Sequence, residues 1–162
     1  MERRDVLKSA STLAAASTAG LAGCSGGGLL GGGGCSTPDS LTDSYPEGDS
    51  YSQSGTFSGS GEDSGENVEG FASASYTDSD DNEYSYTVIE YSSESDASNS
   101  ADNASEFGAG GGSGTPDTAV GYIQSGAYLF VATGPSESDV TSFMQASPTL
   151  SDGCVDNNVE FV

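Results

Sequence analysis

Two segments of the chain alternate between apolar and polar residues, which is the pattern of half-buried β-strands. They span 68–77 and 83–92 and flank the polar sequence 78–82, so we predict a β-hairpin. If Thr77 pairs with Glu83, one face of the hairpin carries small residues opposite large ones, as a packed core requires. The pairs on that face are Ala72–Val88, Ala74–Tyr86 and Tyr76–Tyr84. A slip of one residue would exchange the two faces, so the pattern also specifies the register.

A second hairpin and two helices are predicted further along the chain. Segments 119–124 and 127–133 flank Ser125-Gly126, which is a tight-turn signal. A capping signal predicts a helix over 93–107, and another helix opens at 135–139 and ends at Pro148. One face of this last helix is predicted to carry Val140, Phe143, Met144 and Ser147.

The tetrapeptide Ser-Glu-Ser-Asp occurs at 93–96 and again at 136–139. The same offset aligns Val88 with Val131 and Tyr86 with Leu129. We interpret this as a strand–strand–helix unit present twice, and divergence elsewhere leaves a true duplication open. The predicted fold is therefore α+β, a two-layer domain with a four-stranded antiparallel sheet and two helices on one face, in the order ββαββα.

The charge distribution is one-sided. All three Lys and Arg residues lie within the first eight positions, there is no His, and all but two of the 25 Asp and Glu residues lie beyond position 23. A chain that begins after position 23 therefore cannot form a side-chain salt bridge, and its carboxylates repel one another in dilute buffer. At ~1 M salt the Debye length falls to about 3 Å, which screens most of that repulsion. The composition predicts adaptation to molar salt.

The N-terminus has the parts of an export signal. Arg3-Arg4 precedes a weakly apolar stretch over 9–23 that is too short and too polar to span a bilayer. An Arg pair at this position is typical of the twin-arginine export route. The stretch ends in Leu21-Ala22-Gly23-Cys24, which resembles the lipobox of bacterial and archaeal lipoproteins. An ordinary cleavage site with an incidental cysteine is the alternative.

Together these features resemble the twin-arginine-exported surface lipoproteins of salt-loving archaea, with a specific likeness only over residues 1–24. The resemblance implies a signal peptide over 1–23, lipid on Cys24, attachment to the membrane through that lipid, and a position at its outer face. Gly, Ser and Asp dominate the next segment, so we predict a tether over 24–66 and a small α+β domain over 67–162.

Intrinsic disorder is the competing interpretation of the composition. Leu, Ile, Val and Phe make up 25 of the 162 residues, which is below the ~20% level that indicates disorder in a highly charged chain. These residues are concentrated in the patterned segments instead of being spread evenly. We therefore favour a folded domain on a disordered tether.

Two cysteines remain once Cys24 carries lipid. Outside the cell, Cys35 and Cys154 are expected to form a disulfide, with Cys154 at the domain surface; two free thiols are the alternative. Asn103-Ala-Ser105 is a glycosylation sequon, although such triplets also arise by chance in a Ser-rich chain.

Few kinds of chemistry suit this composition. A Ser or Cys nucleophile needs a base such as His or Lys, and phosphate binding needs Lys or Arg, so we expect no catalytic residues, no cofactor and no nucleic-acid partner. Asp78-Ser-Asp-Asp-Asn82 begins like a calcium loop, but positions six and twelve are Glu83 and Ile89. A solvated turn is the better interpretation, and we expect no metal site, only weak cation binding there in molar salt.

The expected function is therefore a non-enzymatic, lipid-anchored surface module that binds an unknown protein or an envelope component. With Tyr122, Leu129 and Val131 as core positions, an apolar patch lies on the outer sheet face. Its residues are Phe71, Ile89, Ile123, Tyr128 and Phe130. Tyr51 and Phe57, or a tail strand over 155–162, are alternatives that would cover this patch. The rival function is a solute- or metal-binding lipoprotein that serves a transporter.

Overall fold

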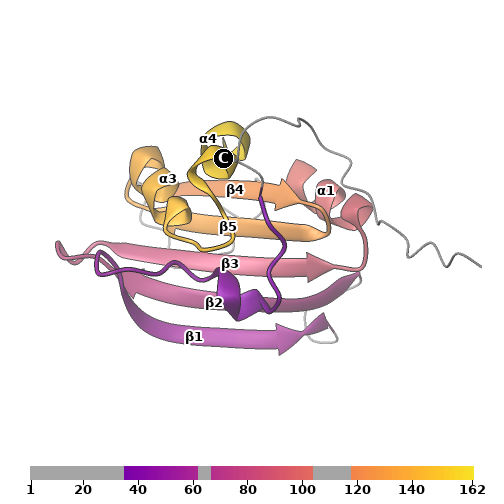
Figure 1. The fold of residues 1–162 in the computed structure, drawn as a ribbon, viewed down its shortest axis with the longest axis horizontal. Helices are drawn as coiled ribbons and strands as arrows, with labels where there is room; N and C mark the ends of the chain where they lie inside the picture. The colour runs from indigo at the N-terminus through magenta and orange to yellow at the C-terminus, as the bar shows by residue number, and fades with distance from the viewer. Residues whose placement is uncertain (1–34, 62–66, 104–117) are drawn as a thin grey trace, which may run out of the picture. The chain divides into compact units, whose positions relative to one another are not determined.

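A computed structural model describes residues 35–61, 67–103 and 118–162, which form one antiparallel β-sheet with helices (Figure 1). The six strands lie in the order β1-β2-β3-β5-β4-β6. Their bounds are β1 Ser52–Ser60, β2 Val68–Thr77, β3 Glu83–Tyr91, β4 Ala119–Ser125, β5 Tyr128–Gly134 and β6 Glu160–Phe161. The helices are the 3-10 helix η1 (Leu41–Ser44), α1 (Glu94–Asp102), α3 (Glu137–Gln145) and α4 (Asp152–Asn158). The α+β class and the antiparallel sheet agree with the prediction, but the sheet has six strands instead of four.

The first predicted hairpin forms in the predicted register. Thr77 pairs with Glu83, and the three small–large pairs of the core face are all present. The turn is held by Asp78, whose Oδ1 accepts the backbone N–H groups of Asp80 and Asn82, each at 2.9 Å. Its Oδ2 accepts the amide of Asn82 at 2.9 Å and the phenol of Tyr84 at 3.0 Å. The turn interpretation of this acidic segment therefore has a local physical basis.

Both predicted helices form behind serine caps. The Ser93 and Ser136 hydroxyls accept the backbone N–H groups of Asp96 and Asp139, each at 3.2 Å. The predicted helix face is buried: Val140, Phe143 and Met144 of α3 are 0% exposed, and Ser147, which follows the end of α3 at Gln145, is 3% exposed. Helix α1 ends at Asp102, earlier than predicted, and the rest of its predicted span, from residue 104 onward, lies outside the described residues.

The helices lie on opposite faces of the sheet, which corrects the prediction of two helices on one face. The inner face, which α3 and α4 cover, carries Val88 and Phe130. The outer face, which α1 covers, carries Leu129 and Val131. In the pairing of β3 with β5, Val88 lies opposite Phe130, so both side chains are on the inner face. Because Leu129-Phe130-Val131 is apolar on both faces, its sequence cannot show which side is the inner one.

Described structure is already present from Cys35, before the predicted domain boundary at 67. The segment assigned to the tether contributes η1 and strand β1, and β1 pairs with β2 along the edge of the sheet. All of Ser52–Ser58 is exposed, so β1 gains its place through backbone pairing and not through apolar burial. A Ser- and Gly-rich strand of this kind has no hydrophobic periodicity, which is why its composition indicated flexible chain.

Aromatic rings fill the inner core around Phe143. Its ring centroid lies 4.8 Å from that of Tyr51, 4.9 Å from Tyr84, 5.1 Å from Tyr76 and 6.1 Å from Tyr86. No buried side-chain nitrogen or oxygen among the described residues lacks a hydrogen-bond partner. The core is therefore aromatic, and its buried tyrosines use their hydroxyl groups in hydrogen bonds, as Tyr86 does by donating to the Ser147 hydroxyl.

Candidate functional site

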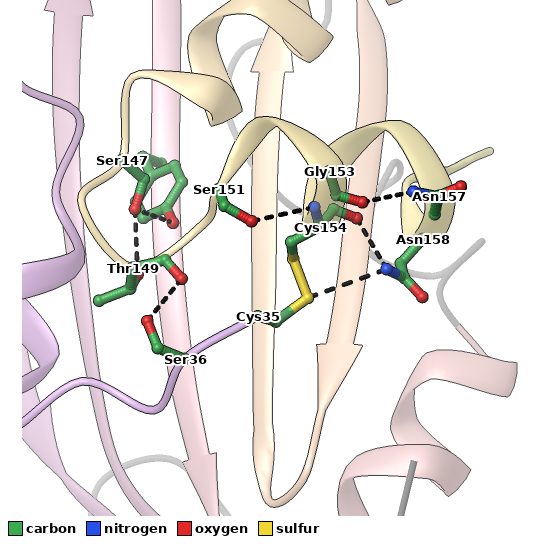
Figure 2. The surroundings of a disulfide bond; sticks show 10 residues. Cys35, Ser36, Ser147, Thr149, Ser151, Gly153, Cys154, Asn157 and Asn158 are labelled. Atoms are coloured by element: carbon green, nitrogen blue, oxygen red, sulfur yellow. Dashed lines mark hydrogen bonds between the residues drawn. A yellow bond between two sulfur atoms is a disulfide. The ribbon is translucent and has the colours of Figure 1, made fainter. Parts of the chain in front are cut away.

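A disulfide joins Cys35 to Cys154 across 119 residues of sequence, with their Cα atoms 5.0 Å apart (Figure 2). This confirms the predicted pairing. Cys154 lies in the first turn of α4, where its backbone N–H donates to the Ser151 hydroxyl at 3.2 Å. It is 0% exposed, so the expectation that it lies at the domain surface is wrong. Asp152 and Gly153, predicted as a turn, are the first residues of α4, and this helix packs on the core and buries the Cys154 side chain.

Hydrogen bonds beside the disulfide also connect the segment that starts at Cys35 to the segment 149–158. The Ser36 backbone N–H and hydroxyl both donate to the Thr149 carbonyl, at 3.0 and 2.9 Å. The Asn158 side-chain amide donates to the Cys154 carbonyl at 2.7 Å and approaches the Cys35 sulfur at 3.9 Å. The start of the described chain is thus fastened to α4 by covalent and polar contacts together.

A hollow of about 330 Å³ opens between α1, strand β4 and the segment that joins α4 to β6. It lies near the C-terminal ends of α1 and α4, where backbone carbonyls of both helices are left without helical partners. Polar residues dominate its lining, together with two apolar ones. The lining residues are Ser98, Ala101, Asp102, Tyr122, Gln124, Asn157, Asn158, Val159 and Glu160.

Hydrogen-bond acceptors dominate this hollow. The Tyr122 phenol donates to Glu160 Oε2 at 2.6 Å, and this bond, with burial, raises the pKa of Tyr122 to about 12. The amide groups of Asn157 and Asn158 donate back to carbonyls of their own helix at 2.6 and 2.7 Å. Figure 2 shows the Asn158 oxygen pointing away from the disulfide. With Asp102 added, the atoms left for a ligand are mainly oxygens that accept hydrogen bonds.

Sequence reasoning missed this hollow. Asp102, Tyr122 and Glu160 belong to three separate elements, and no short motif connects them. The pairing of β6 with β4, which places Glu160 opposite Tyr122, depends on where the chain travels after α4. Only the tertiary structure brings these side chains together.

The structure divides the predicted apolar patch between the two sheet faces. Ile123 and Phe130 are 0% exposed in the inner core. Tyr128 packs partly buried against that core, and its phenol donates to Glu90 at 2.9 Å. Phe71 and Ile89 pair with each other on the outer face. The five residues therefore do not form one surface, because the second hairpin presents the opposite face from the one predicted.

The segments predicted to cover the apolar patch lie on different parts of the sheet. Tyr51 packs on the inner side, 4.8 Å from the Phe143 ring, whereas Phe57 lies 5.4 Å from Phe71. Of the segment predicted as a tail strand, 155–162, the first half belongs to α4, and only Glu160–Phe161 pair as a strand, at the edge beside β4. The outer side of β5 is covered by α1 through Ala97, which is 0% exposed. Of the proposed covers, Phe57 alone reaches the outer face.

The remaining candidate residues are Cys24 and Asn103. Cys24 lies outside the described residues. Asn103 caps the end of α1 and is exposed, with its amide donating to the Asn99 carbonyl at 2.7 Å; residues 104 and 105 of its sequon lie outside the described part. The described residues contain no group of three or more His, Cys, Asp or Glu side chains placed to hold a metal. None of the described helices is long and apolar enough to cross a membrane.

Comparison with family models, with curated proteins and with solved structures finds no match for this chain.

Proposed function

We propose that this protein is a non-enzymatic binding module, anchored by lipid on Cys24 at the outer face of the cell membrane and adapted to molar salt. The export signal and the lipobox-like sequence over residues 1–24 support the location. The Cys35–Cys154 disulfide is consistent with an oxidising compartment. Changing Cys24 to Ser should release the protein into the medium or block its processing, and unchanged membrane association would contradict the anchor.

The hollow beside β4 is the observation that carries the binding proposal. Its volume of about 330 Å³ is at the lower end of the ~300–1,000 Å³ range for small-molecule sites. Its oxygens come from α1, β4, α4 and β6 and line one space, with the Tyr122 ring as part of the wall. We infer that the ligand is small and rich in hydrogen-bond donors.

A polyhydroxylated ligand, such as a sugar unit of an envelope glycan, fits this lining best. Sugar hydroxyls can donate to the carboxylates of Asp102 and Glu160 and to the amide oxygens of Asn157 and Asn158. In molar salt, attraction between these carboxylates and a cationic ligand is strongly screened. Hydrogen bonds depend on short contacts, so they keep more of their strength under those conditions.

Ligand-observed NMR in 2 M KCl tests this proposal, with glucose, galactose and N-acetylglucosamine as probes. Binding of one probe should weaken about tenfold in Asp102→Asn and in Glu160→Gln, because each change removes a charged acceptor. Glu83→Gln is the matched control, since Glu83 is exposed at the start of β3, outside the hollow. No binding by any of the three sugars, or equal losses in the control, would contradict the site.

The same experiment distinguishes binding from catalysis. Asp102 and Glu160 are two carboxyl groups in one hollow, and glycosidases also use a carboxyl pair. A binding module should leave nitrophenyl glycosides intact during prolonged incubation. Hydrolysis that disappears in Glu160→Gln would replace the binding proposal with an enzymatic one.

A solute- or metal-binding lipoprotein that serves a transporter is the second candidate. The two carboxylates in the hollow favour it, since they would attract a cationic solute. Calorimetry with choline and with Ca²⁺ in 2 M KCl separates the two candidates. Heat of binding for either cation, lost in Asp102→Asn, would favour the second candidate over the first.

A further inference from the structure

The two edges of the sheet differ in how they are protected. At one edge, β6 has only two residues, one of which is Glu160. At the other edge, β1 has nine residues, Ser52–Ser60, and none of them is charged (Figure 1). Among the described residues, β2 is the only strand that pairs with β1, so the other edge of β1 is free. Strand β1 carries a register shift between Gln53 and Gly55. From Gly55 onward its unpaired backbone groups can pair with another strand, a contact that natural proteins usually prevent by shortening, charging or interrupting the edge.

The outer face of β1 carries a large exposed side chain next to an open position. Phe57 is 67% exposed, the highest value among the large apolar residues of the described chain. Gly55 precedes it by two positions and lies on the same face, since Gly55 and Phe57 pair with Ser75 and Ser73 of β2. A Cβ placed at Gly55 would meet no atom within 4 Å. The strand thus presents the exposed Phe57 ring and, two residues before it on the same face, free space above Gly55.

The same face already contains a phenylalanine packed over a glycine. Gly59 pairs with Phe71 across β1 and β2, and a Cβ placed at Gly59 would lie only 2.5 Å from Phe71 Cε1. The ring therefore occupies the space that a side chain at Gly59 would need. An aromatic ring that covers a cross-strand glycine is a known stabilising pair in sheets.

We infer that β1 is a self-association surface, on which a second copy of this chain adds its own β1 in antiparallel orientation. With the two-fold axis at Thr56, Phe57 of each copy lies opposite Gly55 of the other. The contact is isologous, because each copy supplies both the Phe57 ring and the free space above Gly55. It extends the six-stranded sheet of one copy into that of the other by strand addition.

The spacing of the Phe57 rings and the absence of charge on β1 both favour a second copy of this chain as the partner at this edge. In this register the two Phe57 rings are diagonal neighbours, a separation that aromatic side chains can span. Since each Phe57 also lies 5.4 Å from Phe71 of its own chain, four rings form a row across the two-fold axis. The chain carries a net charge of −22, so most approaches between copies are repulsive, whereas β1 brings no charge to the contact.

Sedimentation velocity in 2 M KCl tests the inference on the full chain with Cys24→Ser, which removes the lipid and the third thiol. A concentration-dependent dimer is expected. Gly55→Val should weaken that dimer at least about tenfold while leaving the monomer folded, because the new side chain has room in one copy but meets Phe57 of the other. Phe57→Ser should weaken it by a similar factor.

Ser75→Val is the matched control, since it adds a β-branched side chain to the same face one strand further from the edge. It should leave the dimer unchanged, and circular dichroism should be native for all three variants. A monomer at every concentration up to the millimolar range would overturn the inference. A dimer that survives both Gly55→Val and Phe57→Ser would also overturn it, because another surface would then form the contact.

Oxidative cross-linking tests the register. Thr56→Cys should form a disulfide between copies, because position 56 of each copy faces its own equivalent across the axis. Ser58→Cys should not, since its two copies would be offset by four residues, roughly 13 Å along the strands. Efficient cross-linking through position 58 and not 56 would overturn the glycine–phenylalanine pairing and the proposal built on it.

Discussion

Removal of the Cys35–Cys154 disulfide should lower the free energy of unfolding by about 5 kcal/mol. The bridge closes a loop of 119 residues, and the chain-entropy model gives roughly 5 kcal/mol for a loop of that length. Small domains have total stabilities of about 5–15 kcal/mol. The covalent bond is therefore expected to supply a large share of the stability of this one.

The double variant Cys35→Ala with Cys154→Ala is the appropriate perturbation. Cys154 is 0% exposed, so alanine introduces no polar group into the core and removes one sulfur atom. The contacts between Ser36 and Thr149 should persist in the variant, which keeps the native ends of the loop close. Under that condition, most of the loss comes from the larger freedom of the unfolded chain.

Urea unfolding in 2 M KCl is the assay, because urea leaves the ionic strength constant. For m-values of about 1–3 kcal/mol/M, a loss of this size moves the midpoint by roughly 2 M or more. Ser36→Ala is the control for the local contacts, since it removes the hydroxyl bond to Thr149 at 2.9 Å and leaves the bridge intact. Its expected cost is about 1 kcal/mol.

A loss below about 1 kcal/mol in the double variant would refute the loop-entropy reasoning. It would mean that the segment from Cys35 to η1 detaches without unfolding the sheet. Hydrogen exchange would show this directly, because the Ser36 and Tyr45 amides, which donate to Thr149 and Thr42, would lose protection while β3 kept it.

Two further predictions concern the solvent. On dialysis from molar to millimolar salt, the circular dichroism of the sheet should be lost, because the chain has a net charge of −22 and repulsion is no longer screened; a native spectrum at low salt would contradict this. Burial raises the pKa of Tyr76 to about 12 and that of Tyr86 further above its ordinary value, so these phenols stabilise the fold fully below about pH 10 and lose that contribution as the pH rises through their folded values. Absorbance at 295 nm should therefore increase together with unfolding between about pH 10 and 12, and independent titration of all tyrosines near pH 10 would contradict the burial.

The first hairpin, the helix starts and the disulfide pairing could be predicted from the sequence. In 68–77 and 83–92, one face is apolar and the other is polar apart from Phe71 and Ile89, so a single register satisfies the pattern. The serine caps at Ser93 and Ser136 act within one turn of chain, and local signals of this kind do not depend on the rest of the fold. Cys35 and Cys154 were the two cysteines left after assignment of Cys24 to the lipid.

The faces of the second hairpin, strand β1 and the hollow were decided by tertiary structure. Leu129-Phe130-Val131 is apolar on both sides, so only its pairing with β3 determines that Phe130 points inward. Strand β1 lacks an apolar pattern and exists because the edge of β2 offers backbone hydrogen bonds to it. The hollow joins Asp102, Tyr122 and Glu160 from separate elements. Local sequence determines elements whose signals lie within them, whereas contacts between distant segments depend on the topology that the whole chain adopts.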